Sequence, residues 1–291
     1  MSDRIIVTGA TGNLGKKVIG FLLEKMPSSQ LSAFVRNEDK AQDLKAQGIT
    51  VKLGNYDDYP SMVSAFTGVD KIYLISSSEI GKRLQQQTSA INAAKEAGVK
   101  QVFFTSFQRT TEDTSSPLGA LGKDYIATED VLKTSGLAYT IMKHSLYMEV
   151  ILPLCEKALQ TGAIYTPAGE GKVSFAARVD LAEAAANVLT TYGHENEIYE
   201  FSGPLSYSYG DIANILSELS GKKITYVSPT AEIFQQEQLK AGITVERSRF
   251  ALVFGEAIRR GEFDHPDPTL EEFLGRNPLD PREFLKTILG L

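Results

Sequence analysis

Three glycines, Gly9, Gly12 and Gly15, follow a short apolar run near the start of the chain, which reads Arg-Ile-Ile-Val-Thr-Gly-Ala-Thr-Gly-Asn-Leu-Gly over residues 4–15. In a strand-to-helix turn, the first glycine permits a sharp turn, the second lets backbone approach a pyrophosphate, and the third lets the helix pack closely on the sheet. Free N–H groups at such a helix start attract phosphate. A glycine triplet alone also occurs in turns without ligands, so its context decides the interpretation as a dinucleotide site.

Arg36 provides that context, because it ends a predicted strand 21 positions after Gly15, where a dinucleotide fold places its ribose-reading residue. A carboxylate there accepts hydrogen bonds from the ribose 2′-hydroxyl and repels a 2′-phosphate. A guanidinium binds that phosphate with charge-assisted bonds. Arg36, helped by Lys40, therefore predicts NADP(H) as the cofactor. The alternative is a solvated arginine on a loop.

Small polar residues follow three further predicted strands, and ligands in parallel sheets lie over such carboxyl ends. Asn55-Tyr56-Asp57 is expected to flank the adenine, whereas Ser76-Ser77-Ser78 and Thr105-Ser106-Phe107 leave room for ribose and nicotinamide. Each cluster alone is also ordinary turn chemistry. Their shared edge of the sheet favours the cofactor site.

A tyrosine and a lysine four residues apart on a helix would lower the phenol pKa and protonate a carbonyl. Tyr139 and Lys143 have this spacing, but they lie in an alternating, strand-like run that would separate them by ~13 Å. The helical candidate is Tyr125 with Glu129, and a carboxylate does not depress a phenol pKa. Tyr125 is therefore the predicted catalytic residue, acting as a hydrogen bonder or pocket wall rather than as a strong general acid.

Metal and acyl-transfer chemistry find no support in the residue spacing. The three histidines, His144, His194 and His265, are far apart in sequence, and no Cys-x-x-Cys pattern occurs. There is also no Gly-x-Ser-x-Gly elbow. We expect no metal site.

The elements that would position these residues alternate regularly over the first half of the chain. Short β-branched runs near 4–8, 31–35, 50–53, 70–76, 101–105 and 138–142 alternate with amphipathic stretches near 14–26, 38–46, 58–67, 82–97 and 120–135. This predicts an α/β fold, a Rossmann doubly wound parallel sheet with helices on both faces. Gly48, Gly68, Gly98 and Gly136 follow helical stretches, where left-handed C-caps are expected.

The pattern loosens after residue 145. We expect a Rossmann domain over 1–145, to which segments near 173–200 return, and a smaller α+β substrate-binding region over 146–291. Its expected helices lie near 146–161, 179–191, 209–219, 230–241 and 246–260, and its strands near 163–166, 173–177, 197–201 and 223–227. From Glu262 the tail is expected to wrap the surface and end in a docked helix around Phe284 and Leu285.

Composition excludes several classes of function. The 291 residues carry a net charge of −6, which opposes binding to a nucleic-acid backbone. Cys155 is the only cysteine, so no internal disulfide forms and a cytoplasmic location is expected. No leader and no apolar stretch of membrane-spanning length is evident, so no membrane partner is expected.

Several segments resemble the NmrA-like atypical short-chain dehydrogenases, and among them the NADPH:quinone oxidoreductase type-2 and triphenylmethane reductase group. The resemblance covers most of the chain. It rests on residues 8–15, Phe34-Val-Arg-Asn37, Ala46-Gln-Gly-Ile-Thr-Val51, Leu74-Ile-Ser-Ser-Ser78, Ala93-Ala-Lys-Glu-Ala-Gly-Val99, Ala127-Thr-Glu129 and Gly193-His-Glu-Asn196.

The resemblance implies a cleft in which nicotinamide meets an aromatic acceptor. By position it implies that the cofactor contacts are Gly9, Ala10, Thr11, Gly12, Asn13, Leu14, Arg36, Ser76, Ser77, Ser78, Thr105, Met142, Lys143 and His144. Relatives usually carry histidine in place of Tyr125, and Arg-Asn in place of Lys143-His144. We therefore expect the acceptor pocket of this chain to differ from that of the relatives. Its expected walls are Phe107, Tyr125, Tyr147 and Met148.

We expect direct hydride transfer from NADPH to a quinone or a similar electron-poor aromatic acceptor, including dye-type compounds, with no flavin or metal. Such acceptors need little acid catalysis, so positioning and exclusion of water provide most of the rate. The alternative is an NmrA-like regulator that senses NADP(H) and binds a protein partner without turnover. A sugar-nucleotide epimerase is disfavoured, because it needs the missing Tyr-Lys pair. The sequence leaves monomer and homodimer both open.

Overall fold

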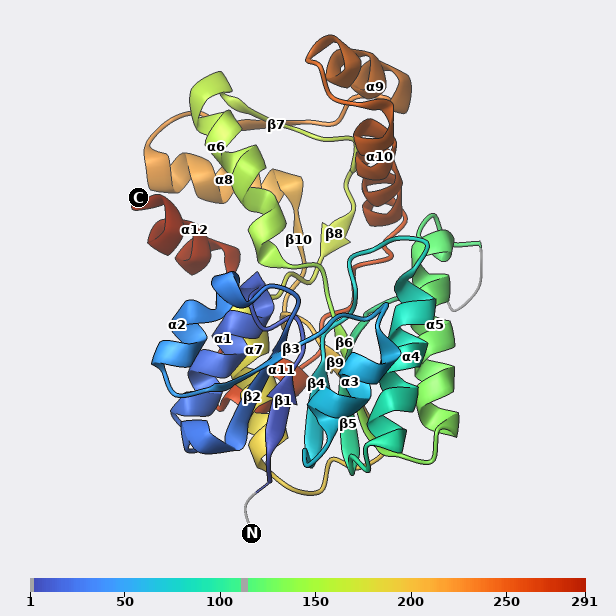
Figure 1. Cartoon of the computed structure of the whole chain (residues 1–291). Helices are drawn as coiled ribbons and strands as arrows, with labels where there is room; N and C mark the ends of the chain where they lie inside the picture. Colours follow the sequence, from blue (N-terminus) through green and yellow to red (C-terminus); the bar gives the residue numbers. More distant parts are fainter. Residues whose placement is uncertain (1–2, 111–114) are drawn as a thin grey trace. The chain divides into compact units, whose positions relative to one another are not determined.

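The computed structural model describes residues 3–110 and 115–291 and contains a seven-stranded sheet (Figure 1). Its strand order is β3-β2-β1-β4-β5-β6-β9, and the pairings from β3 through β6 are parallel. The strands are β1 Ile5–Val7, β2 Leu31–Val35, β3 Thr50–Leu53, β4 Lys71–Leu74, β5 Gln101–Phe107, β6 Ala138–His144 and β9 Glu197–Phe201. The order reverses between β1 and β4, and this reversal opens a crevice at the strand ends where ligands bind in such sheets.

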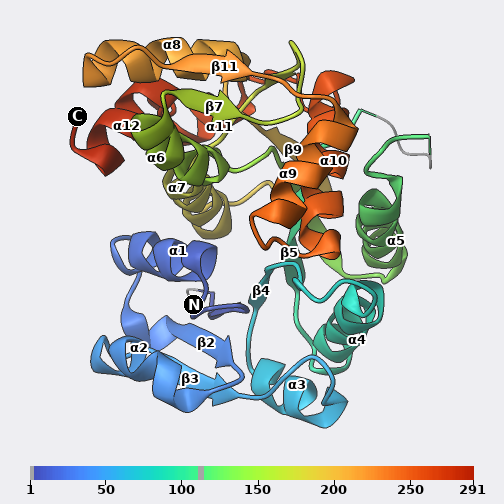
Figure 2. The same ribbon diagram turned by 90° about the horizontal axis from the view of Figure 1, so that it is seen from above.

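Helices cover both faces of this sheet. Figure 2 shows α1 (Asn13–Leu23) and α7 (Arg178–Thr190) on one side, and α3 (Tyr59–Phe66), α4 (Arg83–Glu96) and α5 (Gly119–Thr134) on the other. A 3₁₀ turn, Glu38–Ala41, leads into the short α2, Gln42–Ala46. The predicted fold class is therefore confirmed.

Burial explains why these segments adopt these elements. One apolar cluster joins strands β1, β2, β4, β5 and β6 to helices α3, α4 and α5, and its members include Ile6, Phe34, Phe66, Ile91 and Leu132. Strand β4 is buried over its whole length, as expected for a parallel strand covered on both faces. The predicted C-cap glycines all have positive φ, between 75° and 83°, at Gly48, Gly68, Gly98 and Gly136.

The chain divides into two compact units. Among the described residues, the first unit takes those of 1–107, 124–144 and 178–200, and the second takes those of 108–123, 145–177 and 201–291. The second unit has two small sheets, an antiparallel pair of β8 (Lys172–Val173) with β10 (Tyr207–Ser208) and a parallel pair of β7 (Ala163–Tyr165) with β11 (Thr225–Val227). Its helices are α6 Leu152–Thr161, α8 Tyr209–Ser220, α9 Ala231–Lys240, α10 Val245–Arg259, α11 Thr269–Leu274 and α12 Pro281–Leu289, with a 3₁₀ turn at Met148–Ile151.

Three local features of the second unit differ from the predictions. The strand expected over 173–177 ends at Val173, because the N–H of Ser174 donates to the carbonyl of Phe263 instead of continuing the pairing with β10. Strand β10 and helix α11 were not predicted, since two residues and six residues are too short to show a periodic pattern. The expected terminal helix is present as α12, with Phe284 and Leu285 buried.

Candidate functional site

The glycine turn between β1 and α1 has the close packing that its spacing predicts. Gly9 has a φ of +58°, and the N–H of Gly12 donates to the carbonyl of Gly9 at 2.9 Å. A Cβ on Gly15 would lie 2.4 Å from that same carbonyl oxygen, so only glycine permits this approach of helix to turn. Helix α1 begins without a side-chain cap and without an acidic residue in its first turn. Its N-terminus therefore suits a phosphate group.

A pocket of about 490 Å³ lies beside this turn, and the ends of β1 to β4 contribute to it. The structure brings together most of the predicted cofactor residues here, namely Gly9, Thr11, Gly12, Arg36, Lys40, Tyr56, Ser76, Ser77 and Ser78. Ala10 and Leu14 are buried beneath the turn, and Asn13 is exposed at the start of α1. The set fits a dinucleotide, because a glycine-lined helix start and two exposed cations occupy one hollow.

Tyr56 forms an apolar side of this pocket. Its hydroxyl donates to the carbonyl of Ile75 at 3.3 Å, and its ring lies 6.0 Å from that of Phe34. Burial raises the pKa of the Tyr56 phenol to about 12. The side chain is therefore neutral at physiological pH, and its ring can stack against a flat aromatic group.

Ser76 and Thr105 join the carboxyl ends of β4 and β5. The N–H of Ser76 donates to the Thr105 hydroxyl at 2.9 Å, and the Ser76 hydroxyl donates to the Thr105 carbonyl. Thr105 is buried and does not line the pocket beside the glycine turn. In the structure, Thr105 holds Ser76, the first residue of the serine turn (residues 76–78), in place. The contact of Thr105 with a cofactor stays a prediction.

Tyr125 packs against an arginine that no sequence motif indicated. The guanidinium of Arg83, at the start of α4, lies 4.8 Å from the Tyr125 ring centre. Burial raises the pKa of the Tyr125 phenol, and this outweighs the Arg83 charge and a hydrogen bond with Ser76, which both lower it. The ring of Phe107 is 5.8 Å from that of Tyr125, so two predicted pocket walls are neighbours.

Glu129 is buried one helical turn beyond Tyr125. Its carboxylate accepts a hydrogen bond from the Ser106 hydroxyl and lies 3.9 Å from the Lys133 ammonium. The Ser106 bond ties α5, the helix that carries Tyr125, to the end of β5, whereas the Lys133 contact lies within α5.

Lys143 and His144 end strand β6 beside β5, where His144 is in register with Phe107. The Lys143 ammonium pairs with the Glu200 carboxylate at 3.2 Å. Burial lowers the pKa of His144 to about 3, so its imidazole is neutral. Neither lines the pocket beside the glycine turn, and their cofactor contacts stay predictions.

The remaining predicted walls belong to the second unit. Tyr147 forms an isolated bridge with Ala176, and the N–H of Met148 donates to the Ala176 carbonyl at 2.9 Å. Met148 is buried. Both residues stay predictions as parts of an acceptor pocket.

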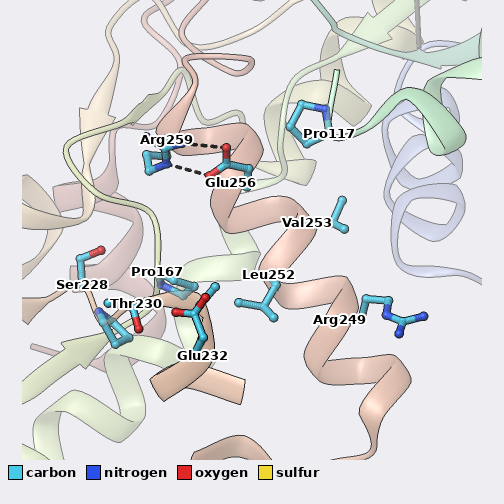
Figure 3. A pocket seen from close by; sticks show the side chains of 12 residues that line it. Pro117, Pro167, Ser228, Thr230, Glu232, Arg249, Leu252, Val253, Glu256 and Arg259 are labelled. Carbon is cyan, nitrogen blue, oxygen red and sulfur yellow. Dashed lines mark hydrogen bonds and ion pairs between the residues drawn. The ribbon is translucent and has the colours of Figure 1, made fainter. Parts of the chain in front are cut away.

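A second pocket, which no predicted site residue lines, lies within the second unit and measures about 540 Å³ (Figure 3). Helix α10 contributes Leu252 and Val253 to it. A fork of two hydrogen bonds, at 2.7 and 2.8 Å, joins Arg259 to Glu256 there. Only the tertiary fold brings Pro117 and Pro167 to this helix, so periodicity gave no signal for the pocket.

The described residues contain neither a metal-binding cluster nor a membrane-spanning helix. Within residues 3–110 and 115–291, no group of three or more histidine, cysteine, aspartate or glutamate side chains is arranged to hold a metal ion. In the part of the chain that the structure describes, no helix is both long and apolar enough to cross a membrane.

Comparison with known proteins identifies relatives over nearly the whole chain. The model of the family described as the NmrA-like family matches residues 1–276. Quinone oxidoreductase 2 of Escherichia coli (strain K12) is 46% identical over 222 residues, which cover 76% of each protein.

Two solved structures are similar throughout. The structure of NADPH-dependent quinone oxidoreductase QOR2 from E. coli complexed with NADPH has a TM-score of 0.92 at 37% identity, and covers 98% of this chain and 99% of that one. Citrobacter sp. triphenylmethane reductase complexed with NADP(H) has a TM-score of 0.92 at 34% identity, and covers 97% of this chain and 99% of that one.

Proposed function

The chain belongs to the NmrA-like family, and from that premise we propose that it is an NADPH-dependent reductase that transfers hydride directly to a quinone or a similar electron-poor aromatic acceptor. The observation that carries this proposal is the single pocket that joins the glycine turn to Arg36 and Lys40. The relatives whose descriptions name NADPH, a quinone reductase and a dye reductase support the same cofactor and acceptor class.

The residues of the pocket would divide the binding of NADPH among them. The start of α1 at Gly12 suits the pyrophosphate, Arg36 and Lys40 suit the 2′-phosphate, and the neutral ring of Tyr56 suits the adenine. When bound, NADPH supplies the hydride. The proposal includes neither flavin nor metal.

Hydride transfer to the acceptor would depend more on placing the acceptor against the nicotinamide than on protonating it. A quinone that receives hydride becomes a hydroquinone monoanion, a phenolate whose charge is delocalised over the aromatic ring, so most of the rate would come from stacking and exclusion of water. Tyr125 and Phe107, in ring contact, would provide an aromatic wall. The raised pKa of Tyr125 keeps its phenol protonated, as a hydrogen-bond donor.

The test is to mix the purified protein with NADPH and a panel of quinones, azo dyes and triphenylmethane dyes, and to follow loss of the reduced-nicotinamide absorbance. Turnover of at least one class supports the proposal. Tight binding of NADPH with no turnover of any acceptor would favour the alternative, a regulator that senses NADP(H). The relatives described as reductases favour turnover. We also propose a cytoplasmic location, which suits the single buried cysteine, Cys155.

A further inference from the structure

In the proposed function, the guanidinium of Arg36 recognises the 2′-phosphate on the ribose of NADPH. This guanidinium already pairs with an anionic side chain, Glu79, in the same pocket. Nη1 of Arg36 lies 3.1 Å from Oε1 of Glu79, on the turn after β4. Both residues line the pocket of the glycine turn. The Arg36 side chain is 72% exposed, so much of its guanidinium surface remains open to another anion.

Glu79 is held by neighbours and is not a freely moving surface carboxylate. Its second oxygen, Oε2, accepts a hydrogen bond from Nε2 of Gln86 at 3.2 Å. Gln86 is 2% exposed and also donates to Asp57. The backbone N–H of Glu79 donates to the Ser77 hydroxyl at 3.2 Å. These bonds keep the carboxylate beside Arg36.

A 2′-phosphate that binds Arg36 therefore meets a fixed negative charge. The phosphate is an anion, and like charges that share one cation repel each other. A 2′-hydroxyl, as in NADH, carries no charge and can donate a hydrogen bond to a carboxylate. The Glu79 carboxylate thus weakens the binding of NADPH and can strengthen the binding of NADH.

On the basis of the proposed function, we propose that Glu79 competes with the coenzyme 2′-phosphate for Arg36 and so limits the preference of this site for NADPH over NADH. Arg36 causes the preference for NADPH over NADH, and Glu79 reduces the ratio of the two affinities. Glu79 is a specificity-determining residue that acts through Arg36.

The test is the dissociation constant of each coenzyme, measured by fluorescence titration of the full-length protein at low ionic strength. Glu79→Gln removes the charge and keeps the shape. We expect NADPH to bind about two- to tenfold more tightly and NADH to bind unchanged or about twofold more weakly, with the gain for NADPH shrinking as salt is added. Weaker NADPH binding would show that Glu79 orients Arg36 for the phosphate, and it would overturn the proposal, as would an unchanged ratio of the two constants.

The matched control is Glu38→Gln, which removes the same charge two residues from Arg36. Glu38 is exposed, pairs with Lys45 and does not line the pocket, so we expect its effect on either coenzyme to stay within about twofold. An equal gain in both variants would mean that net charge, and not the Arg36 contact, causes the effect. Circular dichroism confirms folding, and Glu79→Ala provides a second variant with the same expected direction.

The proposed function fails separately from this inference. If the wild-type protein binds neither coenzyme, the proposed function is wrong. If it binds NADPH through Arg36 and Glu79→Gln leaves the preference unchanged, only the role of Glu79 is wrong.

Discussion

The Arg83 guanidinium lies over the Tyr125 ring, 4.8 Å from its centre, and joins the start of α4 to the face of α5 that carries the predicted catalytic tyrosine. Arg83 is buried, and its Nε donates to the Ser77 carbonyl at 2.7 Å. A cation in this position attracts the ring and orients it. Arg83, at the start of α4, therefore contacts both the serine turn and the Tyr125 ring.

We expect Tyr125→Phe to lower kcat by less than about tenfold. Burial raises the pKa of the phenol, which makes it a poor acid, whereas a true general acid contributes about 10²- to 10⁴-fold. Steady-state rates with a benzoquinone across the pH range measure this. If Tyr125→Phe lowered kcat more than a hundredfold and removed the decline of kcat at high pH, Tyr125 would be identified as the proton donor.

Gly15→Ala should weaken NADPH binding and destabilise the fold by about 1–3 kcal/mol, because its Cβ would lie 2.4 Å from the Gly9 carbonyl oxygen. Gly20→Ala, on the exposed side of the same helix, is the control. Apart from its chain neighbours and the backbone of its own helix, no described atom lies within 4 Å of its added Cβ, so we expect a gain of about 0.5–1 kcal/mol. Urea unfolding and nucleotide titration measure both variants. Equal stabilities for the two would contradict the close packing at Gly15.

Arg36→Ala should cost about 1.5–3 kcal/mol of NADPH binding, which is about 10- to 150-fold in the dissociation constant, since a charge-assisted hydrogen bond is lost. NADH binding should change little. Lys17→Ala, an exposed lysine on α1 outside the pocket, is the control for net charge. Equal losses for NADPH and NADH would remove Arg36 from recognition of the 2′-phosphate.

The stability of the protein should fall in acid partly because of His144. Burial lowers its pKa to about 3, below the ordinary value of 6.5, so between these values the unfolded chain binds a proton that the folded chain excludes. The contribution of His144 is therefore fully present above pH 6.5 and is lost as the pH falls toward 3, by at most about 1.4 kcal/mol per pH unit. We expect His144→Asn to have a flatter dependence of the free energy of unfolding on pH. Parallel curves for the two proteins would rule out this linkage.

The local pattern predicted the fold well, because strands such as Thr50–Leu53 and Lys71–Leu74 are short runs that include β-branched and apolar residues, and they lie between helices followed by a glycine of positive φ. Such signals act within a few residues, and the covered parallel sheet follows from their alternation. The two-residue β10 and the six-residue α11 gave no such signal, because neither spans enough periods of a strand or helix pattern for the repeat to be recognised.

By itself, the sequence determined the doubly wound sheet, the glycine turn and the cation at the end of β2, since each depends on residue type and spacing along the chain. Only the tertiary structure decided that the Glu79 carboxylate pairs with Arg36 and that the Arg83 guanidinium lies over the Tyr125 ring. Glu79 is 43 residues from Arg36, and Arg83 is 42 residues from Tyr125. Parallel strands bring their carboxyl ends together whatever the length of the connections, so contacts over such separations arise from the assembled parallel sheet and not from any local pattern.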